Sequence, residues 1–194
     1  MILPIYTYGQ PVLRQAAVDV DITDPAVREQ LTELIPNMFE TLTAAAGVGL
    51  AAPQVGQDIR LVVIDLTECF DEEEIKEDPT LPAWKRVFIN PEIYAASEEA
   101  CAMEEGCLSL PGLRENVQRP VTVRVRWMDE QFQAHDEELT DFPARVIQHE
   151  CDHLDGTMFV DHLSGLRKQM VKGKLGKLLS GKVHADYKTK SVRK

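Results

Sequence analysis

The chain has 194 residues, of which 44% are hydrophobic and 27% are charged, as expected for a single globular domain with a filled core. No run approaches the about 20 apolar residues of a membrane-spanning helix, and the first residues lack a secretory signal pattern. Four cysteines are too few for a disulfide scaffold. We therefore expect a cytoplasmic protein with no membrane partner, acting as a monomer.

The net charge of −11 hides an asymmetry along the chain. Residues 163–194 hold ten basic side chains and one acidic side chain, a balance of +9, which leaves −20 for residues 1–162. The acidic part argues against a nucleic-acid cleft within the fold, whereas the basic segment is suited to contact phosphate or an acidic surface.

The first predicted element is a helix that begins at Asp24-Pro25 and ends near Gly47. Asp24 is a suitable cap, and Gly47 favours termination. Apolar residues recur at three- and four-residue spacings, which lets the helix bury one face: Val27, Leu31, Leu34, Ile35, Met38 and Leu42.

The segment that follows, residues 47–57 (GVGLAAPQVGQ), contains three glycines and one proline. Since it has no hydrophobic period, we expect a loop whose backbone closely approaches a ligand.

Three β-rich runs come next, at residues 59–66, at 87–89 with their flanks, and at 121–127. They predict an antiparallel sheet. Residues 67–82 are rich in acidic side chains and prolines, which indicates an exposed loop to which no chemistry is assigned.

A second helix is predicted from Thr140 or Asp141 to about Leu154, with Gly156 just beyond its end. A third, amphipathic helix is expected in the basic segment, with its apolar stripe at Leu163, Leu166, Met170, Leu175, Leu178 and Leu179. Strands surrounded by helices predict the α+β class.

The second helix carries an H-E-x-x-H motif, His149-Glu150-Cys151-Asp152-His153. At about 100° per residue the two histidines lie about 40° apart on one helix face, so both imidazoles can reach one metal ion. Glu150 projects about 60° beyond His153, where a carboxylate can act as a general base on a water molecule at the ion. The alternative interpretation is a pair of surface histidines.

A catalytic metal site generally has three protein ligands, and Cys107 is the best remaining candidate. It follows Gly106 in the segment EGCLSLP (105–111). The alternative, a buried core cysteine, remains open because spacing alone does not decide between them. The other thiols are interpreted as ordinary cysteines, because Cys151 lies about 200° from His149 around the helix and Cys69 and Cys101 have no ligand-like neighbours.

Three segments together make the chain resemble the bacterial type of peptide deformylase: GVGLAAPQ (47–54), EGCLS (105–109) and QHECDHLDG (148–156). The resemblance covers nearly the whole chain. It implies that Cys107 is the third ligand beside His149 and His153. It also implies antiparallel sheets surrounding a central metal-bearing helix, with a C-terminal helix. The acidic segment 67–82 departs from the family pattern as an insertion.

The implied activity is removal of the formyl group from the N-terminal methionine of new polypeptides, with release of formate. The residues suit this hydrolysis, because Glu150 is placed to take a proton from water and return it to the leaving nitrogen. The resemblance further implies that the Gln54 side-chain amide and the Leu108 backbone N–H stabilise the tetrahedral oxyanion.

An apolar slot is needed for the methionine side chain. Phe142 and Val146 fall about 20° and 60° from His149 on the helix, where they are suited to form its wall. Arg145 falls about 40° to the other side, so we expect its stem to border the slot and its guanidinium to reach solvent. The family pattern adds three residues, with the Gly49 backbone binding the peptide: Val48, Gly49 and Met103.

The expected cofactor is ferrous iron, which the resemblance implies. By ligand softness, a Cys-His-His site also accepts zinc, nickel or cobalt.

Two other functions have to be considered. A zinc endopeptidase would use a downstream third ligand, for which His162 is available, but it would not need Cys107 or the glycine-rich segment. A non-catalytic metal-binding adaptor would have four closed ligands and no use for the free carboxylate of Glu150.

Residues 1–162 are therefore expected to form the catalytic part, with 163–194 as a basic helical extension of the same domain. We expect this extension to bind the ribosome, since its charge would overcome the repulsion between the acidic body and ribosomal RNA. The alternative interpretation is a solvated basic helix without a partner. No expected ligand lies beyond residue 165, so the extension is predicted to be dispensable for hydrolysis of short formyl-Met peptides.

Overall fold

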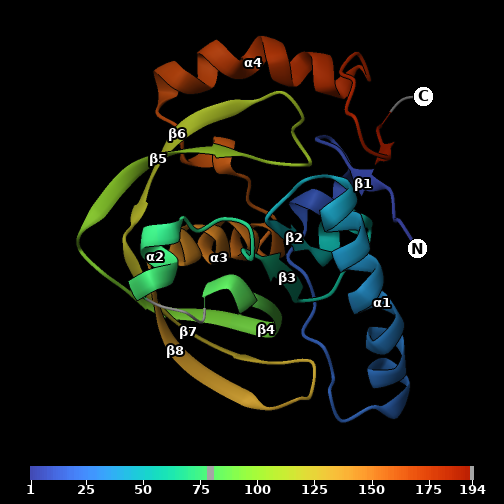
Figure 1. The fold of residues 1–194 in the computed structure, drawn as a ribbon. Coiled ribbons are helices and arrows are strands. Elements are labelled where there is room, and N and C mark those ends of the chain that lie inside the picture. The colour runs from blue at the N-terminus through green and yellow to red at the C-terminus, as the bar shows by residue number, and fades with distance from the viewer. Residues whose placement is uncertain (78–80, 193–194) are drawn as a thin grey trace.

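The main structural frame is a five-stranded antiparallel sheet with the strand order β2-β3-β4-β7-β8 (Figure 1). The computed structural model describes residues 1–77 and 81–192. The strands of this sheet are β2 (Gly49–Ala51), β3 (Leu61–Asp65), β4 (Lys85–Ala96), β7 (Thr122–Met128) and β8 (Ala134–Thr140). The three predicted β-rich runs correspond to β3, β4 and β7, and their antiparallel pairing is confirmed.

Helix α3 (Asp141–Leu154) crosses this sheet and lies at the centre of the molecule (Figure 1). Ala144, Ile147 and Cys151 are buried in the same apolar cluster as the sheet residues Phe88 and Val125. Cys151 is thus a core residue, as predicted. Because one face of α3 is fixed on the sheet, the remaining face is directed toward the other layer of the molecule.

That other layer is a hairpin of strands β5 (Ala100–Gly106) and β6 (Arg114–Pro120). The sequence pattern does not predict this hairpin. Its pattern is obscured because two of its buried residues, Glu105 and Arg119, are charged and pair with each other, so the alternation of apolar and polar residues that marks a half-buried strand is absent. The predicted α+β arrangement of sheets around a central helix is confirmed.

Helix α1 (Pro25–Ala44) confirms the first predicted helix, and the Asp24 carboxylate accepts a hydrogen bond from the Ala26 N–H at its start. Leu31, Met38 and Leu42 are buried in a second apolar cluster, which also includes residues of β3 and β4. The α1 helix therefore covers the sheet independently of α3.

The two segments predicted to be loops contain short regular elements. Residues 47–57 form strand β2 and the 3₁₀ helix η2 (Ala52–Val55). All of β2 is buried, so no alternation marks it as a strand. Residues 67–82 contain helix α2 (Glu72–Glu77) and the start of the 3₁₀ helix η3 (Leu81–Ala83), and part of that prediction lies outside the described residues.

The chain then passes through the 3₁₀ helix η4 (Phe159–His162) into helix α4 (Gly165–Leu179), which lies beside the β5–β6 hairpin (Figure 1). The helix was predicted correctly, but its apolar stripe only in part, since Leu163, Leu175 and Leu178 pack in one apolar cluster. Val171 and Leu178 are buried, whereas Leu166 is 72% and Met170 is 63% exposed. Leu166 and Met170 lie about 140° and 100° from Val171 around the helix, too far to share its buried face.

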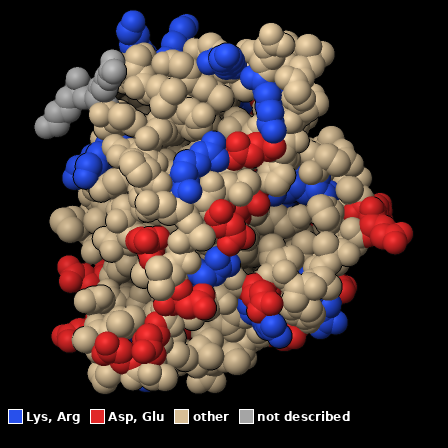
Figure 2. Space-filling model, turned by 180° about the vertical axis from the view of Figure 1, so that it is seen from behind, with Lys and Arg blue, Asp and Glu red and all other residues tan. Residues whose placement is uncertain are grey.

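The last strand, β9 (Thr189–Lys190), pairs in parallel with β1 (Ile5–Tyr6), which precedes the 3₁₀ helix η1 (Pro11–Arg14). The first and last strands of the described chain therefore lie side by side (Figure 1). Seen from behind, Lys and Arg gather toward the α4 end, and Asp and Glu are frequent toward the opposite end (Figure 2). In the described part of the chain, no helix combines the length and apolar character needed to cross a bilayer.

Candidate metal centre and substrate cavity

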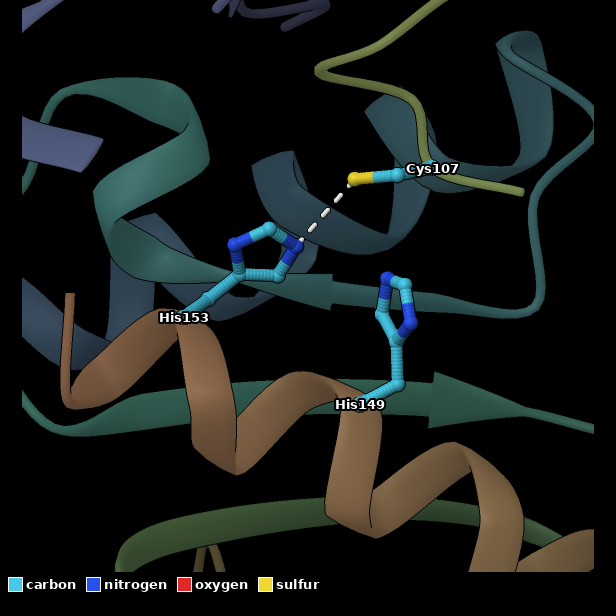
Figure 3. Close-up of side chains that lie close together, drawn as sticks. All are labelled: Cys107, His149 and His153. Carbon is cyan, nitrogen blue, oxygen red and sulfur yellow. Dashed lines mark hydrogen bonds between the residues drawn. The ribbon is translucent and has the colours of Figure 1, made fainter. Parts of the chain in front are cut away.

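The structure brings together the three residues predicted to hold a metal ion. His149 and His153 project from one face of α3, and Cys107 lies just after the end of β5 (Figure 3). Their potential ligand atoms all lie within 4.8 Å of one another, and Cys107 Sγ is 3.2 Å from His153 Nε2. His162 is not part of this group, since its Nε2 lies 2.7 Å from Asp152 Oδ2, which removes the third ligand of the endopeptidase interpretation.

The surroundings of Cys107 favour the charged form of its side chain. Burial alone would raise the pKa of the thiol, but the adjacent His153 and His149 lower it to about 5. A thiolate is the form that binds metal. His153 Nδ1 is buried without a hydrogen-bond partner among the described residues, while its Nε2 faces the sulfur (Figure 3). The donor set therefore fits a divalent transition-metal ion.

Glu105 orients one of these histidines and was not assigned a role from the sequence. His149 Nδ1 donates to Glu105 Oε2 at 2.8 Å, which leaves His149 Nε2 to face the cysteine. Arg119 Nε also donates to this carboxylate, at 2.7 Å. Burial would raise the pKa of Glu105, but the hydrogen bonds from His149 and Arg119 hold it well below its usual range. A carboxylate in this role could have been expected from the sequence, since metal-binding histidines generally donate their second N–H to a carboxylate or carbonyl.

The prediction for Arg145 is wrong with respect to its guanidinium. Arg145 is only 4% exposed, and its Nη1 donates to Glu105 Oε1 at 2.9 Å and to the Val117 carbonyl at 2.8 Å. The reason is that the side of α3 carrying Arg145 faces the unpredicted β5–β6 hairpin and not solvent. Arg145 still borders the cavity, as predicted for its stem.

Glu150 lies beside the ligand cluster in a space that a glycine leaves open. A Cβ atom at Gly49 would lie 2.8 Å from Glu150 Cδ and 2.9 Å from its Cγ, so any side chain there would displace the carboxylate. Burial raises the pKa of Glu150 to about 7, and its Oε2 has no hydrogen-bond partner within the described part of the chain. An unpartnered buried carboxylate beside three metal-type ligands is suited to proton transfer.

The Gln54 side chain is held in one orientation. Its Oε1 accepts a hydrogen bond from the Ala51 N–H at 2.8 Å. Its Nε2 lies 3.2 Å from Ser109 Oγ and 3.5 Å from Cys107 Sγ. The side-chain amide thus presents its N–H groups to the region of the ligand cluster, and not its carbonyl.

A cavity of about 870 Å³ opens onto this cluster. Most of the predicted catalytic and substrate-binding residues line it: Val48, Gly49, Gln54, Leu108, Phe142, Arg145, Val146 and Glu150. Met103 does not line it. Met103 belongs to β5, two residues before Glu105 in the chain, and its contact with substrate stays a prediction.

The C-terminal segment also lines the cavity, although it was predicted to be dispensable for hydrolysis of short formyl-Met peptides. Lys174 of α4 and residues 184–187 are part of the wall. Tyr187 Oη donates to the Leu108 carbonyl at 2.7 Å. No sequence signal identified Tyr187, because this contact depends on the chain's return after α4.

Comparisons with known proteins agree with this geometry. The family model described as polypeptide deformylase matches residues 2–169. The peptide deformylase of Salinibacter ruber is 49% identical over 96% of this chain and 93% of that protein, and that of Christiangramia forsetii is 45% identical over 97% and 95%. The solved peptide deformylase structure from Legionella pneumophila has a TM-score of 0.75 at 37% identity and covers 91% of this chain and 95% of that one. The chain therefore belongs to the polypeptide deformylase family, metal-dependent hydrolases that remove the N-formyl group from newly made polypeptides.

Proposed function

We propose that Cys107, His149 and His153 hold the metal ion of this deformylase and that Glu150 is its general acid and base. The observation that carries the proposal is that three ligand atoms within 4.8 Å of one another adjoin a buried carboxylate oxygen with no partner among the described residues. When bound, the cation supplies a Lewis acid that activates water and polarises the formyl carbonyl.

The proposed ion is ferrous iron, with zinc, nickel or cobalt able to replace it. A thiolate with two imidazoles accepts all four ions, so the donor set by itself does not select among them. The preference for iron comes from the family resemblance. Oxidation of iron and of the thiolate in air gives a test. We expect the iron form to lose activity in air while the nickel or cobalt form retains it, and an air-stable iron form or a fully active zinc form would contradict the proposal.

Glu150 takes a proton from the attacking water and returns it to the leaving nitrogen in this proposal. The oxyanion that forms on the formyl carbon needs hydrogen-bond donors. Gln54 Nε2 and the Leu108 N–H are assigned this role, supported by the fixed orientation of the Gln54 amide. The Leu108 N–H makes no hydrogen bond to another described residue, so it is available to a substrate in the cavity.

The methionine side chain is proposed to occupy a slot walled by Val48, Phe142 and Val146. The substrate backbone is proposed to lie along β2, an edge strand of the sheet. The Asp65 N–H donates to the Val48 carbonyl. In an antiparallel pair the next residue, Gly49, then directs its N–H and C=O away from β3. These groups face the open edge, where an extended peptide can add as a further strand.

Metal content and formate release from a formyl-Met tripeptide, measured together, test this division of roles. We expect Glu150→Gln to keep its metal and to lose formate release by roughly 10²–10⁴-fold. Cys107→Ala should lose both metal and activity. Equal metal loss in the two variants would contradict the proposed roles. If the unaltered chain binds metal but releases no formate, a metal-binding adaptor would be favoured. Cleavage of internal peptide bonds would favour a zinc endopeptidase.

We also propose that the enzyme acts as a monomer in the cytoplasm and binds the ribosome through its basic C-terminal extension, residues 163–194, which includes α4. The helix exposes Leu166 and Met170 among basic side chains, and such a surface is suited to RNA with an adjacent protein contact. Co-sedimentation with ribosomes should weaken steeply as the salt concentration rises. Binding that is independent of salt would leave α4 as a solvated helix only.

A further inference from the structure

The chain beyond α4 is anchored next to the cavity and is not a free tail. After Gly181 it returns along the molecule, and residues 184–187 form part of the cavity wall. The Ile5 N–H donates to the Lys188 carbonyl at 2.8 Å, and the Thr7 N–H donates to the Lys190 carbonyl at 3.1 Å. The C-terminal segment is therefore fixed to β1, which positions the residues just before β9.

Tyr187 is the residue of this segment that reaches the catalytic loop. Its hydroxyl donates to the Leu108 carbonyl at 2.7 Å, a contact between residues 79 positions apart. The ring is partly buried, and burial raises the pKa of Tyr187 to about 12. The hydroxyl therefore keeps the proton that it donates. An aromatic ring has only two rotatable side-chain bonds, so the hydroxyl is held in place at little entropic cost.

Leu108 is restrained from several directions. The Leu110 N–H donates to the Cys107 carbonyl at 2.9 Å, and the Tyr8 N–H donates to the Ser109 carbonyl at 2.8 Å. The Leu108 side chain packs against Gly47, since a Cβ atom added at Gly47 would lie only 2.8 Å from Leu108 Cδ1. The carbonyl of Leu108 itself is held by Tyr187. The two ends of the chain thus hold the loop that carries a metal ligand and an oxyanion donor.

We propose that Tyr187 is a positioning residue for deformylation, whose hydroxyl fixes the Leu108 backbone so that the Leu108 N–H is directed at the oxyanion. This inference rests on the proposed role of the Leu108 N–H. A donor that is held in place before the reaction stabilises the transition state without a cost for ordering it. Loss of the Tyr187 hydroxyl should therefore lower kcat more than it changes KM.

The test is Tyr187→Phe, which removes one oxygen and keeps the ring. We expect kcat for a formyl-Met tripeptide to fall roughly three- to ten-fold, the effect of one hydrogen bond, with KM changed by less than about two-fold. Metal content and the thermal unfolding midpoint should stay close to those of the unaltered chain. An unchanged kcat, or a higher KM with the same kcat, would overturn the proposal, and the second result would make Tyr187 a substrate contact only.

Two matched control variants distinguish a positioning role of Tyr187 from a general loosening of the C-terminal segment. Tyr94→Phe removes the same atom from an exposed residue of β4, where the hydroxyl donates to Asp136 Oδ1 at 2.6 Å. Tyr6→Phe removes the acceptor of the Lys190 Nζ hydrogen bond at 2.8 Å, which anchors the C-terminal segment but does not touch Leu108. We expect both to keep kcat within about two-fold, because neither hydroxyl contacts the loop at Cys107 and Leu108. A loss in Tyr6→Phe equal to that in Tyr187→Phe would overturn a specific role for Tyr187.

Glu150→Gln, measured in the same assay, distinguishes failure of this inference from failure of the proposed function. If Glu150→Gln remains active, the proposed catalytic roles are wrong. If Glu150→Gln is inactive and Tyr187→Phe is fully active, only the role of Tyr187 is wrong.

Discussion

Helix α3 and the loop after β5 supply the two halves of the metal centre, and they are specified in different ways. In α3, the relative placement of His149, Glu150 and His153 follows from helical geometry alone. The loop at Cys107 and Leu108 has no regular structure, and its conformation depends on contacts with Gln54, Tyr8 and Tyr187. The helix can therefore be recognised from five consecutive residues, whereas the loop requires most of the fold.

The largest expected effect would show that even the helical half depends on a distant residue. In Gly49→Ala, the new methyl group would occupy the space of the Glu150 carboxylate. We expect kcat to fall roughly 10²–10⁴-fold, the usual contribution of general acid–base catalysis, with the metal retained. Gly173→Ala is the matched control, because apart from its chain neighbours and the backbone of its own helix no described atom lies within 4 Å of its added Cβ, and it should stay fully active. Normal activity in Gly49→Ala would mean that the helix alone positions the base.

Gln54→Ala tests the loop half directly. It removes a proposed oxyanion donor, so we expect kcat to fall roughly 10²–10³-fold while the metal content remains unchanged. The exposed neighbour Gln57 provides the control, since Gln57→Ala should leave formate release unaffected. Metal loss in Gln54→Ala would instead show that Gln54 mainly holds Cys107 in place.

Glu105→Gln weakens the link between the two halves. The amide cannot balance the charges of Arg119 and Arg145, which both donate to Glu105. We expect about 3 kcal/mol lower free energy of unfolding, measured by urea titration of the metal-free protein, and about 10- to 100-fold weaker metal binding.

Glu104 is the control for that prediction. It is exposed and its pair with Arg114 spans 3.6 Å, so Glu104→Gln should change neither quantity measurably. If both variants behave alike, the buried ion pairs do not support the metal centre.

The smallest expected effect concerns α4, where the basic surface carries two exposed apolar side chains. Leu166→Ser combined with Met170→Ser should change the free energy of unfolding by no more than about 0.5 kcal/mol per substitution and leave kcat unchanged, because both residues are exposed. Ribosome co-sedimentation of this double variant should fall. A large loss of stability would mean that these side chains pack against the protein in solution.

The difference between helix α3 and the loop after β5 also explains which features could be predicted from the sequence. Periodic apolar residues and caps identified α1 and α3, and the spacing of His149 and His153 indicated the metal. The β5–β6 hairpin was missed because its buried Glu105 and Arg119 look like surface residues in the sequence. The guanidinium of Arg145 was misplaced for the same reason, since its partner was unknown. Tyr187 could not have been predicted, because only the return of the chain after α4 brings it to Leu108.

The parallel pairing of β1 with β9 has a consequence for how the molecule is made. Tyr6 and Lys190 are 184 positions apart in the chain, so in a chain growing from its N-terminus their contact can form only after all the residues between them have been made. Residues 184–187, which form part of the cavity wall, are synthesised after every other residue that lines it. A chain that has been made only as far as α4 therefore lacks this part of the cavity wall.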